Sequence, residues 1–167
     1  MRTIFLIGFM GCGKTTVSQE LGSKLKLPVI DSDQLVEERE HKKIRDIFSG
    51  SGEEYFRRAE TLALKETAGK PAVVSCGGGA VLRKENVEIM KREGTVVWLT
   101  AAPQTILERC SKSNDRPILN GHMNVEYIEG LMKEREKYYR AAADLAVETD
   151  GKTAGAIAEE IADWVNR

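Results

Sequence analysis

The sequence is poor in the residues that mark disulfide-linked and metal-scaffolded proteins. It contains three cysteines, Cys12, Cys76 and Cys110, which is an odd number without the paired spacing of a zinc site. We therefore expect three reduced thiols, as is usual in the cytoplasm. The two histidines, His41 and His122, have no further ligands at metal-binding spacing, so we interpret both as ordinary polar residues.

Long apolar runs and an excess of one charge are also missing. No run approaches the roughly 20 apolar residues of a transmembrane helix, and the chain opens on a strand pattern rather than a signal peptide. The 25 basic and 26 acidic residues nearly cancel, so no overall field favours nucleic acid or an anionic membrane. At 167 residues the chain has the length of one domain. We expect a single cytoplasmic domain, 1–167, with no nucleic-acid or membrane partner.

What the sequence does contain is a glycine-rich loop near its start. Residues 8–15 read GFMGCGKT and fit the phosphate-binding pattern G-x-x-x-x-G-K-[ST]. An apolar run at 4–7 predicts a buried strand before the loop, and helical spacing at 16–26 predicts a helix after it. Lys14 would reach the β- and γ-phosphates and the Thr15 hydroxyl would bind Mg²⁺. A plain glycine turn would not require Lys-Thr at its end, so the loop predicts nucleotide binding but leaves the reaction open.

Strand-like and helix-like patterns alternate along the rest of the chain, with no linker or repeat. With the first strand, short β-type runs make five, at 4–7, 28–30, 72–75, 95–99 and 144–147. Further helical patterns lie at 34–39, 55–67, 84–91, 103–110, 125–141 and 153–165. Such alternation favours a parallel sheet with helices on both faces, a three-layer α/β fold. The polar segment 111–123 is long for a connection and is typical of an active-site lid.

Two carboxylates, Asp31 and Asp33, follow the second predicted strand. The carboxyl ends of parallel strands line the ligand crevice, so both should face the phosphate loop. One could lie near Mg²⁺ and the other near the hydroxyl that accepts the phosphoryl group. Because the third strand does not end in aspartate, Asp31 is the nearest candidate for the metal carboxylate. The alternative is structural, with Ser32 or Asp33 capping the helix that starts near Gln34.

Three glycines, Gly77, Gly78 and Gly79, come directly after the third predicted strand. They remove side chains from the rim of the crevice, which suits a ligand that touches main-chain N–H groups. The alternative is a plain turn.

Three arginines are candidates for binding an anion. Arg57 has Glu60 three residues on, which could hold its guanidinium in place. Arg116 lies in the expected lid, and Arg135 lies in the long helix after it. A guanidinium grips a carboxylate through two parallel hydrogen bonds. The alternative for each arginine is a solvated surface position.

Taken in order along the chain, these motifs resemble the shikimate kinase family. The resemblance rests on residues 8–15, 31–33, the Phe-Arg-x-x-Glu of 56–60, 77–79, Arg116-Pro117 and Arg135-x-x-Tyr138. It implies a nucleoside monophosphate kinase-like fold, a P-loop domain with a five-stranded parallel sheet, a lid at about 111–123 and a substrate-binding helical segment at about 32–61. It also implies ATP-dependent phosphorylation of the 3-hydroxyl of shikimate, on the pathway to chorismate and aromatic amino acids, by a cytoplasmic monomer with Mg²⁺ as cofactor.

The resemblance also implies roles for single residues. Catalysis would depend on Lys14, Asp33 and Arg116. ATP would be bound by Gly11, Cys12, Gly13, Lys14, Thr15, Thr16, Arg109 and Arg116, with Arg109 against the adenine. Shikimate would be bound by Asp33, Arg57, Gly77, Gly78, Gly79 and Arg135, with the two arginines on its carboxylate. Mg²⁺ would be held by Thr15 and Asp31.

Two other functions are compatible with a P-loop. The first is a kinase of another small acceptor, such as gluconate or a nucleoside monophosphate, although Asp33 would sit badly beside a nucleotide's phosphate. The second is a catalytically idle nucleotide-binding module, which the loss of Asp33 or Arg135 would have marked. Both residues are present.

Overall fold

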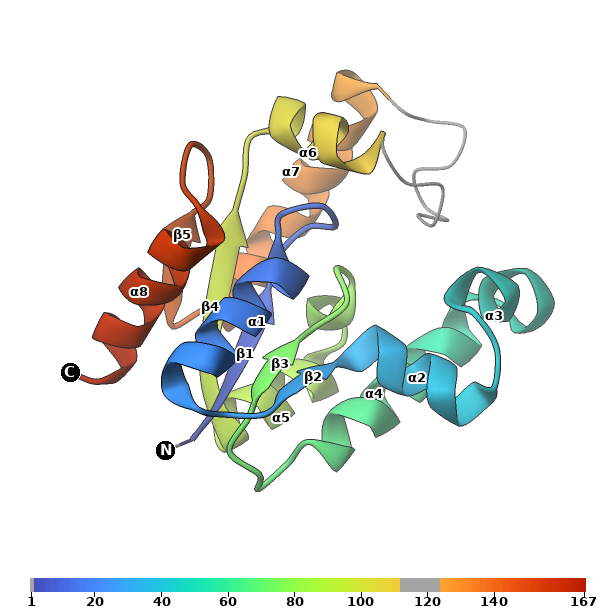
Figure 1. The fold of residues 1–167 in the computed structure, drawn as a ribbon. Coiled ribbons are helices and arrows are strands. Elements are labelled where there is room, and N and C mark those ends of the chain that lie inside the picture. Colours follow the sequence, from blue (N-terminus) through green and yellow to red (C-terminus); the bar gives the residue numbers. More distant parts are fainter. Residues whose placement is uncertain (1, 112–123) are drawn as a thin grey trace.

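A computed structural model of the chain describes residues 2–111 and 124–167. The expected lid at 111–123 lies outside the described residues apart from Ser111, and so does Arg116. Figure 1 shows how the described helices and strands are arranged. In chain order these elements are β1 (Thr3–Ile7), α1 (Lys14–Leu25), β2 (Val29–Asp31), α2 (Ser32–Glu40), α3 (Ile44–Ser51), α4 (Glu53–Glu66), β3 (Val73–Ser75), the short 3₁₀ helix η1 (Ala80–Leu82), α5 (Lys84–Glu93), β4 (Gly94–Thr100), α6 (Pro103–Cys110), α7 (Val125–Ala142), β5 (Leu145–Glu148) and α8 (Ala154–Val165).

The five strands form one sheet in the order β2-β3-β1-β4-β5, and every pair is parallel. The predicted five-stranded parallel sheet is therefore confirmed. β1 lies at the centre, between β3 and β4, and the glycine-rich loop leaves its carboxyl end. Because β3 is its neighbour, the glycines that follow β3 meet the loop at the same edge of the sheet. The strand order thus brings together two motifs about seventy residues apart in the sequence.

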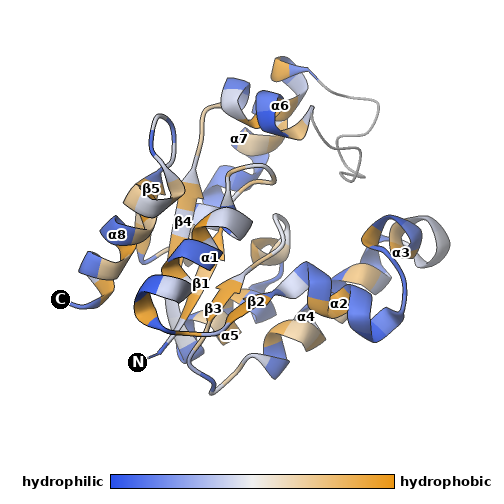
Figure 2. Cartoon of the chain, in the orientation of Figure 1, coloured by the Kyte–Doolittle hydropathy of each residue, from blue (hydrophilic) through white to orange (hydrophobic). Residues whose placement is uncertain are grey.

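Helices cover the sheet on both faces, as expected from the alternating pattern (Figure 1). On the central strand, Ile4 and Leu6 belong to a core shared with α1 and α8. Phe5 and Ile7 belong to a second core on the opposite face, shared with α5 and the end of α7. Successive residues of a strand point to opposite faces, so one short apolar strand supplies both cores. Figure 2 shows the resulting pattern, with apolar strands inside and hydrophilic outer helix faces.

A third, smaller core lies among α2, α3 and α4, beside the β2 edge of the sheet (Figure 1). Its buried members are Val36, Ile47, Phe56, Ala59 and Ala63. The Phe48 and Phe56 rings also contact each other, with centroids 5.0 Å apart. This three-helix unit falls within the substrate-binding segment expected at about 32–61.

The element boundaries differ from the predictions in two instructive places. Helix α3 was not predicted, although Ile44, Ile47 and Phe48 have helical spacing. Helix α2 begins at Ser32, two residues earlier than predicted, because Asp31 caps it. None of the described helices is both long enough and apolar enough to cross a membrane.

Candidate functional site

The glycine-rich loop wraps the N-terminus of α1. Gly11 and Gly13 have φ values of 78° and 98°, a left-handed conformation that glycine adopts without strain. Helix α1 begins at Lys14, and no side chain caps its first turn. Its free backbone N–H groups therefore point into the loop, where the helix dipole favours an anion. This local geometry is that of a phosphate-binding loop.

Two cationic side chains lie against the loop. The Lys14 ammonium donates to the carbonyl oxygens of Gly8 at 2.6 Å and Phe9 at 3.2 Å. Arg109, from α6, donates through NH1 to the carbonyl oxygen of Gly11 at 3.1 Å. Both side chains also line the cleft described below. The glycine-rich motif itself predicts the position of Lys14. Arg109 reaches the loop because α6 packs beside it.

Cys12 contributes to the loop differently from its neighbours. Its side chain is buried in the core with Ile4 and Leu6, only 1% exposed. The thiol lies close to Gly8, where an added Cβ would come within 2.7 Å of the sulfur. Of the predicted ATP-binding residues, Cys12 could therefore reach a phosphate through its backbone N–H only.

Asp31 ends β2 and caps α2. Its Oδ1 accepts hydrogen bonds from the backbone N–H groups of Asp33 at 2.9 Å and Gln34 at 3.1 Å. The alternative predicted from the sequence, a cap by Ser32 or Asp33, is therefore wrong, because both residues lie within α2 and Asp31 caps it. Ser32 is fully buried instead, and its hydroxyl accepts from the Gly77 N–H at 3.1 Å.

The cap and a metal-binding role for Asp31 are compatible. One carboxylate oxygen serves the helix, and Asp31 still lines the cleft together with Thr15. No cluster of three or more His, Cys, Asp or Glu side chains that could hold a metal occurs among the described residues. Mg²⁺ commonly takes one or two protein oxygens and completes its shell with phosphate and water. Thr15 and Asp31 fit that donor set.

Each of the three glycines leaves room for a particular neighbour. A Cβ on Gly79 would lie 2.4 Å from both terminal nitrogens of Arg57, and one on Gly78 would lie 3.2 Å from the Met10 nitrogen. A Cβ on Gly77 would lie 2.7 Å from an oxygen of Asp33 and 2.7 Å from an oxygen of Glu60. At Gly77 and Gly79 a side chain would overlap charged groups of the site, which a plain turn does not account for.

Arg57 is buried and held by two carboxylates. Its NH1 donates to Glu60 at 3.1 Å, and its NH2 donates to Glu53 at 3.3 Å. The pairing of Arg57 with Glu60, expected from their spacing, is confirmed. Glu60 is completely buried, whereas the Glu53 side chain is 59% exposed. Burial raises the pKa of Glu60 to about 7, against the opposing effect of Arg57, and Asp33 adds to the rise.

Arg135, from α7, is the second buried guanidinium of the site. It is 6% exposed and lies over the Phe9 ring, with its CZ atom 5.6 Å from the centroid. Its NH1 has no hydrogen-bond partner among residues 2–111 and 124–167. A buried, charged donor of this kind costs free energy unless an acceptor reaches it. Arg135 therefore points to an anionic ligand.

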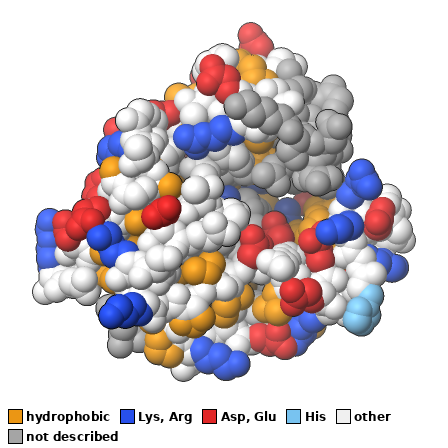
Figure 3. Space-filling view, viewed as in Figure 1, with side chains coloured by type: hydrophobic (Ala, Val, Ile, Leu, Met, Phe, Trp, Pro, Cys, Tyr) orange, Lys and Arg blue, Asp and Glu red, His pale blue; other side chains and the backbone are white. Residues whose placement is uncertain are grey.

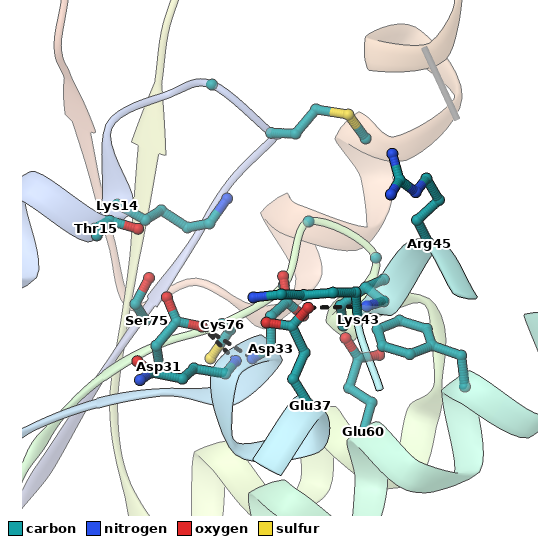
Figure 4. Close-up of a pocket in the computed structure, with 18 of the residues that line it drawn as sticks. Lys14, Thr15, Asp31, Asp33, Glu37, Lys43, Arg45, Glu60, Ser75 and Cys76 are labelled. Carbon is teal, nitrogen blue, oxygen red and sulfur yellow. Dashed lines mark hydrogen bonds between the residues drawn. The ribbon is translucent and has the colours of Figure 1, made fainter. Parts of the chain in front are cut away.

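These residues surround one cleft of about 770 Å³. Figure 3 shows acidic, basic and apolar side chains gathered around a hollow beside α2 and α3. In Figure 4, Lys14 and Thr15 lie at one end of the cleft, Asp31 and Asp33 along its floor, and Glu60 and Arg45 towards the other end. Of the residues predicted from the sequence, those that line it are Gly11, Gly13, Lys14, Thr15, Thr16, Asp31, Asp33, Arg57, Gly77, Gly78, Gly79, Arg109 and Arg135.

The far wall of the cleft lies within the substrate-binding segment expected at about 32–61, but none of its individual residues was predicted from the sequence. It is formed by Glu37, Lys43, Ile44, Arg45 and Phe48, from α2, α3 and the turn between them. Glu37 fixes that turn, because its carboxylate accepts from the backbone N–H of Ile44 at 2.9 Å. The helical spacing of Ile44, Ile47 and Phe48 was the available signal. That spacing covers only two helical turns, which is too short to predict a helix from the sequence.

The sequence and the fold both match one known family. A family model described as shikimate kinase matches residues 10–166. A shikimate kinase of Persephonella marina is 44% identical over 162 residues, which cover 96% of this chain and 97% of the relative. One of Sulfurihydrogenibium is 40% identical over 168 residues, 100% of this chain and 99% of the relative.

A solved structure agrees with these sequence matches. The shikimate kinase of Acinetobacter baumannii in complex with shikimate has a TM-score of 0.95 and 34% identity, covering 99% of this chain and 93% of that one. The chain belongs to the shikimate kinase family.

Proposed function

We propose that the chain transfers the γ-phosphoryl group of ATP to the 3-hydroxyl of shikimate, on the pathway to chorismate. The observation that carries this proposal is a pair of buried guanidiniums, Arg57 and Arg135, in the same cleft as a phosphate-binding loop. The carboxylate of shikimate would bind both of them, and it would supply the acceptor that Arg135 NH1 lacks within the described part of the chain. Arginine suits this task because its planar fork matches a carboxylate.

ATP would bind at the opposite end of the cleft. The loop N–H groups of Gly11, Cys12, Gly13, Lys14, Thr15 and Thr16 would hold the phosphates, and Arg109 would lie against the adenine. Lys14 would exchange its contacts with the loop carbonyls for the terminal phosphates and stabilise the charge that develops in transfer. Arg116, from outside the described residues, would close over the same phosphates.

Asp33 would position the acceptor. It lies between the loop and the Arg57–Glu60 pair and lines the cleft with both. The 3-hydroxyl would donate a hydrogen bond to the Asp33 carboxylate, and its proton would pass there as the new phosphorus–oxygen bond forms and ADP leaves. Because the transition state of phosphoryl transfer is loose, correct positioning contributes more than the basicity of Asp33.

Mg²⁺ is proposed as the cofactor, held by Thr15 and by the Asp31 oxygen that does not cap α2. When bound, it would neutralise charge on the β- and γ-phosphates. The same proposal includes a cytoplasmic monomer. The three free cysteines, all buried, are consistent with a reducing compartment.

Turnover measured as ADP formation tests the function directly. ATP consumption should require shikimate and should not be supported by gluconate or a nucleoside monophosphate. Shikimate should also raise the melting temperature, since a ligand specific to the native state stabilises it by about 2.7 kcal/mol at a hundredfold excess over Kd. Arg57→Ala and Arg135→Ala should each remove most of this shift. A shift produced by gluconate and not by shikimate would show another acceptor, and binding of ATP without any turnover would show an idle module.

A further inference from the structure

We propose that Glu60 takes up a proton when the carboxylate of shikimate binds to Arg57 and Arg135, so that the buried charges of the site stay balanced. The inference rests on the proposed function, and it adds a positioning residue whose protonation is linked to substrate binding. The Glu60 side chain is completely buried. Glu60 acts on the substrate through Arg57, which donates a hydrogen bond to it.

The two carboxylate oxygens of Glu60 have different surroundings. Its Oε1 accepts from Arg57 NH1 at 3.1 Å, whereas its Oε2 has no hydrogen-bond partner among residues 2–111 and 124–167. Oε2 and an oxygen of Asp33 both lie beside Gly77, each 2.7 Å from the point that a Cβ on this glycine would occupy, and the charge of Asp33 acts on Glu60. An added proton on Oε2 would turn a crowded acceptor into a donor toward that side.

The charge count favours such a proton once a ligand is bound. The charged groups that act on Glu60 are the cations Arg57 and Arg135 and the carboxylate of Asp33. With Glu60 itself, this group holds two positive and two negative charges. A ligand carboxylate makes three negative charges against two positive ones, at a place where Glu60, Arg57 and Arg135 are all buried. It also competes with Glu60 for Arg57. An uncompensated buried charge is costly, and the usual response is for a group to neutralise. Protonation of Glu60 restores the balance.

The groups that face Glu60 from each neighbouring element agree with this assignment. On its own helix, Arg57 lowers its pKa, and the exposed Glu53 lies beyond Arg57. Asp33 from α2 raises the pKa and Arg135 from α7 lowers it. Cys76, at the end of β3, has its own pKa raised by burial and stays a neutral thiol. With burial as the largest cause, the pKa of Glu60 is about 7, so the proton is exchangeable at physiological pH.

The direction of the linkage follows. A ligand carboxylate raises the pKa of Glu60 further, so proton uptake is greatest above pH 7 and vanishes near pH 5.5, where Glu60 is already protonated. Shikimate affinity should therefore fall as the pH rises from 7 to 9, by up to about tenfold per pH unit. Shikimate stays ionised across this range and contributes no proton.

Calorimetric titration of the enzyme with shikimate, without nucleotide, tests the proposal. At pH 7.5 the binding enthalpy should differ between phosphate and Tris buffers, whose heats of ionisation differ, by the amount that corresponds to uptake of most of one proton. At pH 5.5 the difference should vanish. Glu60→Gln, which keeps an acceptor for Arg57, should abolish the buffer dependence and flatten the pH profile of the KM for shikimate. Glu53→Gln is the matched control, because Glu53 pairs with the same arginine but is exposed, and it should keep the proton uptake.

Carbon NMR of protein labelled at glutamate Cδ identifies the residue. At pH 7.5, shikimate should move one resonance, absent from Glu60→Gln, toward the position of a protonated carboxyl. The same measurement on the unsubstituted enzyme decides the question if Glu60→Gln does not fold, because Asp33 carries no such label. Binding of shikimate with no buffer dependence and no shifted resonance would overturn the inference alone. No binding of shikimate at either pH would instead overturn the proposed function.

Discussion

The Tyr139 hydroxyl donates a hydrogen bond of 2.5 Å to the carbonyl oxygen of Gly78, across sixty-one positions of sequence. Tyr139 is buried in α7, and its ring stacks on Trp98 of β4 at a centroid distance of 5.8 Å. The contact fixes the glycine triplet against the helix that carries Arg135. The wall that would bind shikimate is thus held in place by α7 and the sheet together.

Tyr139→Phe should weaken this wall without emptying the core. The ring stays, but the Gly78 carbonyl loses its donor, which should lower the free energy of unfolding by about 1–2 kcal/mol. The KM for shikimate should rise more than kcat falls, because the acceptor site is loosened and the phosphate loop is not. Tyr138→Phe, at the exposed neighbouring position, is the control and should change neither value. Equal effects of the two substitutions on KM would argue against the role of the hydrogen bond.

The two roles of Asp31 can be separated by choice of substitution. Asp31→Asn keeps an oxygen for the N–H groups of Asp33 and Gln34, so its melting temperature should stay close to that of the unsubstituted protein. Its turnover should fall and should need a higher Mg²⁺ concentration. Asp31→Ala should show the same catalytic loss and, in addition, lose about 1 kcal/mol of stability with the cap. An Asp31→Asn enzyme with an unchanged Mg²⁺ dependence would remove Asp31 from the metal site.

Gly79→Ala should damage the site through a steric clash. The new Cβ would overlap the Arg57 guanidinium, which is already pinned between Glu53 and Glu60. We expect the loss of most shikimate binding, read as a lost melting shift, together with reduced stability. Gly130→Ala is the matched control. Gly130 lies within α7, and no other atom of residues 2–111 or 124–167 comes within 4 Å of its added Cβ. Alanine should therefore stabilise that helix by up to about 1 kcal/mol and leave binding intact.

Stability should depend on pH through Glu60. Its pKa is raised on folding from 4.5 to about 7, so between these values the native protein binds more protons than the unfolded chain. The free energy of unfolding contributed by Glu60 therefore falls as the pH rises through this window. Thermal melts from pH 5 to 8 should show the unsubstituted protein losing stability relative to Glu60→Gln, whose amide stays neutral. Parallel pH profiles for the two proteins would contradict the raised pKa.

The sequence predicted the sheet, its flanking helices and most of the cleft, for physical reasons visible at particular residues. The loop at 8–15 has a fixed spacing because phosphate binding requires one. The central strand β1 is a fully buried apolar run, as expected for the middle of a sheet with helices on both faces. Asp31 and Asp33 were predicted at the cleft because strand ends face it. The choice of Asp31 as the helix cap was not predictable, since any of three adjacent polar residues could have served.

What could not be predicted depends on contacts between distant segments. Within the described part of the chain, Arg135 NH1 has no hydrogen-bond partner and Glu60 is buried. Both facts follow from how α4 and α7 lie around the glycine triplet, and no local sequence pattern predicts such an arrangement. Helix α3 was missed because its apolar stripe covers only two turns. A short stripe of that kind gains its stability from packing on α2 and α4 rather than from its own propensity.

The third core has a consequence for how the acceptor site can change. Val36, Ile47 and Phe56 belong to a core whose buried members come from α2, α3 and α4, whereas α4 also reaches the second core through Leu64. One wall of the cleft is therefore built on a core of its own, and α4 joins that core to the sheet. Its shape can be altered, by substitution or by a bound ligand, while the phosphate loop and the strands beneath it keep their positions. In this architecture the residues that bind the nucleotide and the residues that select the acceptor are therefore supported by different cores.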